Sequence, residues 1–89
     1  MSERQVTIGS KVGLHARPAS LFAKAVKSAG VPVKIAKDGQ PPVNAASLLS
    51  LLTLGAEFGE KVTLSAEGEG ADAALDELAA MLGRDLDAE

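Results

Sequence analysis

The residues with the clearest chemical potential are a histidine, an arginine and a proline that follow one another closely: His15, Arg17 and Pro18. A neutral imidazole is nucleophilic near physiological pH, and a guanidinium can approach phosphate oxygens with two parallel hydrogen bonds. The apolar periodicity that follows predicts a helix whose first turn holds Ala16, Arg17 and Pro18. The first N–H groups of a helix lack partners and attract anions, and proline is tolerated there because no N–H is needed. The pattern predicts a histidine able to carry a phosphoryl group, while a plain helix cap or surface histidine is the simpler alternative.

The composition of the chain excludes several other kinds of chemistry. Cysteine is absent and histidine occurs once, so disulfides, cysteine nucleophiles and the usual transition-metal sites are not expected. The net charge is −3 and the only aromatic residues are two phenylalanines, which disfavours nucleic-acid binding. No run of residues is long and apolar enough for a membrane span or a signal peptide. We expect a cytoplasmic monomer in which residues 1–89 form one domain.

Two periodicities predict the elements on either side of His15. Residues 5–8 alternate as in a half-buried strand, with Val6 and Ile8 on one face. A helical period follows and ends at Gly30, a residue type that favours the helix C-cap. The predicted buried stripe of this helix is Leu21, Phe22, Ala25, Val26 and Ala29. The histidine is therefore predicted to lie between a strand and an amphipathic helix.

A hairpin with one irregular arm is predicted next. Residues 31–36 alternate up to Asp38-Gly39, a dipeptide favoured in tight turns whose two central positions both need positive φ. The returning arm, residues 40–44, contains two prolines that cannot donate hydrogen bonds to a sheet. This arm is expected to be an edge strand or a short irregular one.

A short leucine-rich helix is predicted over residues 47–55. Leu48, Leu51 and Leu52 fall on one helical face. The segment holds more leucines than one face of a short helix can bury, so Leu49 is expected to be exposed.

A last strand and a last helix complete the predicted order. Residues 61–67 alternate with one apolar face. The stripe of the final helix is Ala71, Ala74, Leu75, Leu78 and Leu82. The fold class is α+β: an open-faced two-layer β-sandwich of order βαββαβα, with a four-stranded antiparallel sheet covered on one face by three helices.

Two separated motifs in the chain resemble one family. Residues 13–20, Gly-Leu-His-Ala-Arg-Pro-Ala-Ser, resemble the active-site motif of the HPr family, the histidine-containing phosphocarriers of the bacterial phosphoenolpyruvate-dependent sugar phosphotransferase system. Residues 43–49 together with 53–55 resemble the second signature of that family. The resemblance implies that His15 accepts a phosphoryl group from enzyme I on Nδ1 and donates it to an enzyme IIA domain. It also implies a carrier rather than an enzyme, with no cofactor.

The neighbours of His15 have predicted supporting roles. Arg17 is expected to stabilise the phosphate, and Pro18 to stiffen the geometry around the imidazole. Arg17, Ser20, Lys24 and Lys27 fall along one side of the first helix and form a basic stripe that can steer acidic partner surfaces. With the leucines that the family uses for partner contact, the predicted docking residues are Ser20, Lys24, Lys27, Leu48, Leu49 and Leu52.

Ser47 has two interpretations that the sequence leaves open. In the HPr family of many low-GC Gram-positive bacteria the matching serine is phosphorylated by an ATP-dependent kinase, so the resemblance implies HPr kinase/phosphorylase as a further partner. Serine is also a common helix N-cap, with no regulatory meaning. The chain departs from the usual family pattern nearby, because Ala46 replaces a frequent lysine, Ser50 replaces a frequent glycine, and the hairpin is one residue longer.

The sequence disfavours two alternatives to a sugar-system phosphocarrier and leaves a third open. A related regulator that has lost the histidine is disfavoured because His15 is present. A carrier loaded with a prosthetic group on Ser47 is disfavoured because such carriers are helical bundles whose serine typically follows aspartate, whereas Ala46 precedes it here. A carrier of the nitrogen-related branch of the phosphotransferase system stays open, although the sequence favours the sugar branch.

Overall fold

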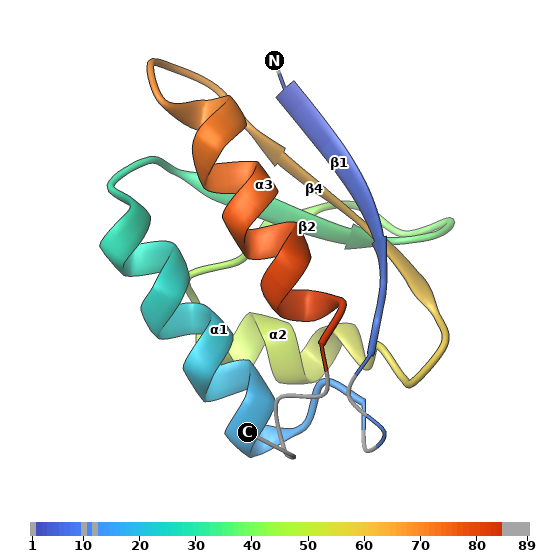
Figure 1. Cartoon of the computed structure of the whole chain (residues 1–89). Coiled ribbons are helices and arrows are strands. Elements are labelled where there is room, and N and C mark those ends of the chain that lie inside the picture. Colours follow the sequence, from blue (N-terminus) through green and yellow to red (C-terminus); the bar gives the residue numbers. More distant parts are fainter. Residues whose placement is uncertain (1, 10, 12, 85–89) are drawn as a thin grey trace.

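The fold is a four-stranded sheet covered by three helices (Figure 1). The computed structural model describes residues 2–9, 11 and 13–84. All strand pairs are antiparallel, and the order across the sheet is β1-β4-β2-β3. The elements are β1 (Ser2–Thr7), α1 (Ala16–Ala29), β2 (Val33–Lys37), β3 (Val43–Asn44), α2 (Leu48–Leu54), β4 (Lys61–Ala66) and α3 (Ala71–Leu82). The predicted α+β order and open-faced arrangement are confirmed.

The central strand β4 shows why the sheet has one covered face. Val62, Leu64 and Ala66 are buried beneath the helices, while the residues between them are exposed or half-buried. Side chains of successive strand residues point to opposite faces, so this alternation leaves the other face to solvent. Val62 pairs with Val6 of β1, and Leu64 pairs with Ile35 of β2.

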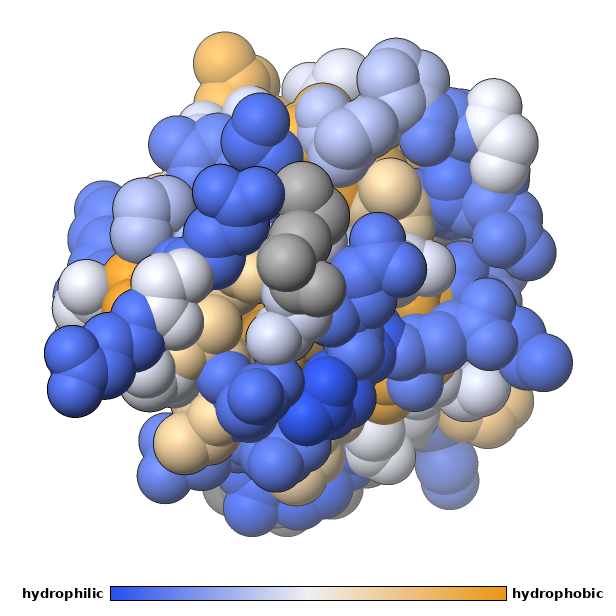
Figure 2. Space-filling model, turned by 90° about the horizontal axis from the view of Figure 1, so that it is seen from above, coloured by the Kyte–Doolittle hydropathy of each residue, from blue (hydrophilic) through white to orange (hydrophobic). Residues whose placement is uncertain are grey.

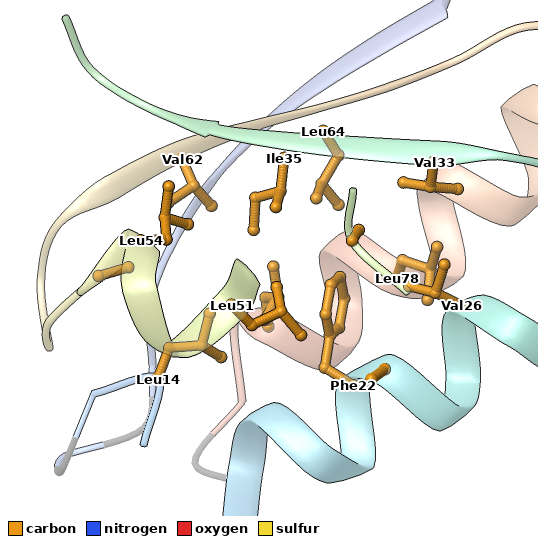
Figure 3. Packing of buried hydrophobic residues seen from close by; sticks show 14 of the residues in the cluster. Leu14, Phe22, Val26, Val33, Ile35, Leu51, Leu54, Val62, Leu64 and Leu78 are labelled. Carbon is orange, nitrogen blue, oxygen red and sulfur yellow. The ribbon is translucent and has the colours of Figure 1, made fainter. Parts of the chain in front are cut away.

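The hydrophobic core fills the space between the sheet and the helices (Figure 3). Phe22 of α1, Leu51 of α2 and Leu75 of α3 are each fully buried, so every helix contributes a large side chain. Burial of one such side chain contributes about 1.5–3 kcal/mol relative to leaving it in water. Figure 2 shows the molecule from the top of the Figure 1 view, which is the end opposite the start of α1. Most of the surface at this end is hydrophilic.

The buried faces of two helices differ from the predicted ones. In α1, Leu21 is 38% exposed, because the helix packs through a stripe centred on Phe22 and Val26 and Leu21 lies at its border. In α2, Leu51 and Leu54 are buried, and the side chains of Leu48 and Leu52 are each 40% exposed. Leu51 and Leu54 are three positions apart and therefore lie on the same side of this short helix. Leu21 is therefore less buried than its place in the apolar stripe of α1 indicated, whereas Leu49 is exposed as expected.

Several boundaries and one turn also differ from expectation. Strand β1 begins at Ser2, and β2 begins at Val33 rather than at residue 31. Gly39 has φ 79°, but no non-glycine residue of the described chain has positive φ, so Asp38 does not adopt the mirror-image turn that was predicted. The returning arm is the two-residue strand β3 at the sheet edge, as its prolines indicated.

Candidate functional site

His15 is the N-cap residue of α1, as predicted. Its backbone is extended, with φ −87° and ψ −172°, and its side chain is exposed and makes no capping hydrogen bond. The first turn of α1 contains no acidic residue. The positive end of the helix dipole therefore meets no neutralising group in that turn.

The first turn of α1 offers two free backbone donors. Within the described part of the chain, the N–H groups of Ala16 and Arg17 have no acceptor, and Pro18 has no N–H to satisfy. The Ala19 N–H donates to the His15 carbonyl at 2.8 Å and makes the first bond of the helix. Free N–H groups at a helix start bind anions, so this turn is suited to phosphate oxygens.

Buried residues on both sides hold the exposed histidine in place. Leu14 is buried in the core beside α2, and its N–H donates to the Ala56 carbonyl at 2.8 Å (Figure 3). On the helical side, Pro18 and Ala19 are buried. The imidazole thus projects from a backbone that is anchored one residue before it and three residues after it.

Gly13 is required by its conformation and by its surroundings. Its φ is 76°, which favours glycine strongly. A Cβ there would lie 3.0 Å from the Ala56 oxygen, 3.0 Å from Glu57 Cα and 3.5 Å from His15 Cδ2. Gly13 therefore separates the imidazole from the turn that follows α2, with no room for a larger residue.

A second glycine, Gly9, was missed by the sequence analysis. Its N–H donates to the Leu82 carbonyl at 2.9 Å, and a Cβ at this position would overlap the backbone of Gly83. The absence of a side chain at Gly9 therefore lets the chain that leaves β1 toward His15 pack against the backbone at the end of α3. No local motif marks this contact, because its two sides lie more than seventy residues apart.

The predicted basic stripe lies on the surface of α1. Arg17, Lys24 and Lys27 are exposed and Ser20 is half-buried. Within the described residues none of these three cations is in an ion pair. Their positive charge is therefore available to an approaching partner, although the chain as a whole has a net charge of −3.

The leucines predicted for docking lie on α2, which packs beside α1 (Figure 1). Leu49 is 75% exposed, the largest value among the exposed large hydrophobic residues of the described chain. Leu48 and Leu52 are partly exposed on the same helix. The predicted docking residues therefore come together on two adjacent helices.

Ser47 is the N-cap of α2. Its Oγ accepts the Ser50 N–H at 3.2 Å, so the capping role that the sequence predicted is confirmed. The side chain is half-buried.

The described residues contain neither a cluster of metal ligands nor a membrane-spanning helix. Among the residues that the structure describes, no group of three or more His, Cys, Asp or Glu side chains is placed to hold a metal ion. No helix in the described part of the chain is long and apolar enough to cross a membrane.

Comparison with known proteins identifies the class and then the family. Residues 2–84 match the family model PTS-HPr, described as the PTS HPr component phosphorylation site. Together with the fold, this match defines a phosphocarrier rather than a stand-alone catalyst. The chain belongs to the HPr family of the phosphotransferase system.

Relatives of known name cover nearly the whole chain. The phosphocarrier protein HPr of Streptomyces coelicolor is 52% identical over 87 residues, covering 98% of this chain and 94% of its own. The phosphocarrier protein NPr of Shewanella violacea is 41% identical over 85 residues, covering 96% and 92%. The crystal structure of a phosphocarrier protein HPr from Bacillus anthracis superposes with a TM-score of 0.85 at 36% identity, covering 91% of this chain and 95% of that one.

Proposed function

We propose that His15 carries the phosphoryl group, taking it from phosphorylated enzyme I and passing it to an enzyme IIA domain. The observation that carries this proposal is the exposed imidazole at an uncapped helix start, with the Ala16 and Arg17 N–H groups free in the described structure. The proposal rests on this geometry and on membership of the HPr family.

The transfer step exchanges one P–N bond for another and needs no cofactor. In the neutral imidazole that keeps its proton on Nε2, Nδ1 has a free electron pair that attacks phosphorus. The new P–N bond to His15 forms as the bond to the donor's leaving nitrogen breaks, and the reverse exchange delivers the group to the acceptor. Phosphoryl transfer needs chiefly in-line positioning and charge stabilisation, which a small carrier can share with its partner.

Arg17 and Pro18 support the transferred group in this proposal. The Arg17 guanidinium is exposed and can pair with two phosphate oxygens, while the first-turn N–H groups bind a third. Pro18 is fully buried and restricts the backbone that follows the histidine. Arg17→Lys is therefore expected to retain charge but to lose the bidentate geometry.

Partner docking is assigned to the basic stripe and the exposed leucines. Ser20, Lys24 and Lys27 follow the histidine along α1, and Leu48, Leu49 and Leu52 lie on the adjacent α2. Charged groups at the rim raise association rates, and exposed apolar groups supply contact area. We infer that enzyme I and enzyme IIA use overlapping parts of this surface, because both must reach one imidazole.

Regulation at Ser47 by HPr kinase/phosphorylase is a second, weaker candidate. It is favoured by the position of Ser47 at the start of α2, next to the exposed Leu49. We further infer that the protein works as a cytoplasmic monomer of one domain in the sugar branch. The higher identity to an HPr than to an NPr favours that branch.

Phosphate mapping tests the central proposal. The protein is incubated with phosphoenolpyruvate and enzyme I, and the phosphorylated residue is located by mass spectrometry at mildly alkaline pH. We expect one label on His15, absent from His15→Ala and reduced in rate for Arg17→Met. Label that survives in His15→Ala would falsify the proposal. ATP and an HPr kinase, added separately, test Ser47, because phosphoserine survives the acid that removes phosphohistidine.

A further inference from the structure

The turn that follows α2, residues 55–60, holds both ends of the segment that carries His15; we call it the clamp turn. One hydrogen bond, described above, joins it to the residue before the histidine. At the other end of the segment, the Ile8 N–H donates to the Glu60 carbonyl at 2.9 Å, and the Ile8 carbonyl accepts the Gly59 N–H at 3.0 Å. The clamp turn therefore fixes where this segment leaves the sheet and where it enters α1.

A lysine on the neighbouring strand β2 ties the clamp turn together. Lys37 Nζ lies 3.4 Å from the Gly55 carbonyl oxygen and 3.4 Å from Glu60 Oε1. The same Oε1 accepts the Glu57 N–H at 2.8 Å. The Lys37 side chain is 23% exposed and that of Glu60 40%, so water screens the pair only in part. These contacts link the first residue of the turn to its last.

Movement of the clamp turn would reach the imidazole through Gly13. The point where a Gly13 Cβ would sit is 3.0 Å from Glu57 Cα and 3.5 Å from His15 Cδ2. The ring and the turn thus border the same small space beside Gly13, which only a hydrogen atom can occupy. Closely packed groups transmit small displacements, since no free volume absorbs them.

We propose that Lys37, acting with Glu60 through the clamp turn, is a positioning residue for the His15 imidazole. The proposal rests on the transfer function proposed above. Neither side chain needs to touch the phosphate, because the effect reaches the imidazole through the backbone of the clamp turn and Gly13. In-line transfer is sensitive to such placement, and an error of about 1 Å can slow a reaction about 100-fold. A partly exposed ion pair adds little stability, so its loss should alter placement more than folding.

Single-turnover transfer from phosphorylated enzyme I tests the proposal. Lys37→Met removes both contacts of the ammonium, and Glu60→Gln keeps an oxygen for the Glu57 N–H while removing the charge. Lys34→Met is the matched control, because Lys34 lies on the same strand, is exposed and makes no side-chain hydrogen bond or ion pair with the described residues of the clamp turn. At saturating donor, we expect transfer to Lys37→Met to be about tenfold slower, with unchanged half-saturation and unfolding midpoint. Lys37→Arg should recover most of the rate, and Lys34→Met should match the unmodified protein.

Nuclear magnetic resonance of the imidazole separates positioning from folding and from the proposed function. In Lys37→Met and Glu60→Gln, we expect the His15 ring and Leu14 amide signals to shift while the signals of α3 stay in place. Full transfer rates in both variants, or equal losses in Lys37→Met and Lys34→Met, would overturn the positioning role. If Lys37→Met does not fold, Glu60→Gln decides. If the unmodified protein does not accept phosphate, the proposed function is overturned. The positioning role is then still tested by the resonance experiment, where imidazole signals that do not shift in these variants would refute it.

Discussion

The starts of α1 and α2 solve the same structural problem in opposite ways. Both helices begin after a residue with extended backbone, His15 in one case and Ser47 in the other. Ser47 Oγ accepts an N–H of the first turn of α2, and the Asn44 side chain accepts the Ala46 N–H just before it. At α1 the His15 side chain accepts no N–H, and the N–H groups of Ala16 and Arg17 are free in the described structure.

The difference separates a helix start used for stability from one available to a ligand. A good N-cap side chain contributes about 0.5–2 kcal/mol, which α2 gains and α1 does without. Neither helix has an acidic residue in its first turn, so the capping side chain is what distinguishes them, and the uncapped start keeps the attraction of its dipole and free N–H groups for an anion. We infer that the α1 start has kept binding capacity at the expense of local stability.

Among the predicted changes, His15→Asp should have the largest effect, because it should cap the start of α1 and remove the imidazole. Aspartate is a preferred N-cap, so we expect the variant to be more stable by about 0.5–2 kcal/mol in urea unfolding. Phosphoryl transfer should be abolished, because the imidazole acceptor is gone. His15→Ala is the control that loses transfer without gaining a cap. A His15→Asp variant no more stable than His15→Ala would show that the α1 start cannot be capped.

Leu49→Asp tests whether the first turn of α2 is a docking surface rather than only a structural one. Because Leu49 is 75% exposed, the fold should be unaffected, and a carboxylate near a helix start is favourable. We expect transfer from enzyme I to need about tenfold more donor for half-saturation, as for other exposed contact residues. Ala73→Asp adds the same charge at an exposed position of α3 and should leave transfer unchanged. Unchanged kinetics for Leu49→Asp would remove Leu49 from the docking surface.

Ser47→Ala tests how much the serine cap stabilises the start of α2. Loss of the bond to the Ser50 N–H should lower the free energy of unfolding by about 1 kcal/mol, measured by urea denaturation. Ser47→Asp should retain stability, because aspartate caps equally well. Transfer to His15 should keep its rate in both variants when measured on folded protein. Equal stability of Ser47→Ala and the unmodified protein would contradict the capping role.

Acid titration of the third helix start gives the smallest expected effect. Asp72 lies in the first turn of α3, and hydrogen bonding from Ser2, followed by the nearby charge of Arg4, lowers its pKa below the usual value. The folded state therefore binds this proton less readily than the unfolded chain, so Asp72 adds stability at neutral pH and loses it on acidification. We expect Asp72→Asn to be slightly less stable at pH ~7 and equally stable once the carboxylate is protonated, well below pH ~3.9. A difference that grows on acidification would contradict this sign.

Predictability from sequence differed sharply between elements. The alternation of β4 and the stripe of α3 were read correctly, because each has an apolar face that repeats with a single period. Gly30 and Gly55 end their helices with positive φ, as a helix-ending glycine commonly does. The sequence did not single out Leu51 and Leu54 as the buried residues of α2, because leucine occupies nearly every position there and periodicity then carries no information.

The candidate site divides in the same way. Residues 13–29 alone indicated a histidine before a helix, a first turn able to receive an anion, and a basic stripe, because these features depend on residues within a few turns of one another. The anchors of that histidine depend on contacts between distant segments. Ala56 receives the Leu14 N–H, Gly9 packs against the end of α3, and Lys37 holds the clamp turn.

Local chemistry therefore specified the identity and surroundings of the proposed phosphate acceptor, and tertiary structure decided how it is held. A helix start, a glycine cap or an alternating strand follows from interactions over a few residues, which a single sequence displays directly. The close approach of Gly9 to Gly83, and the bonds from the clamp turn to Ile8, form only when sheet, helices and turns pack together. Such contacts leave no periodic signal in the chain, because each joins residues whose separation is set by the topology of the fold.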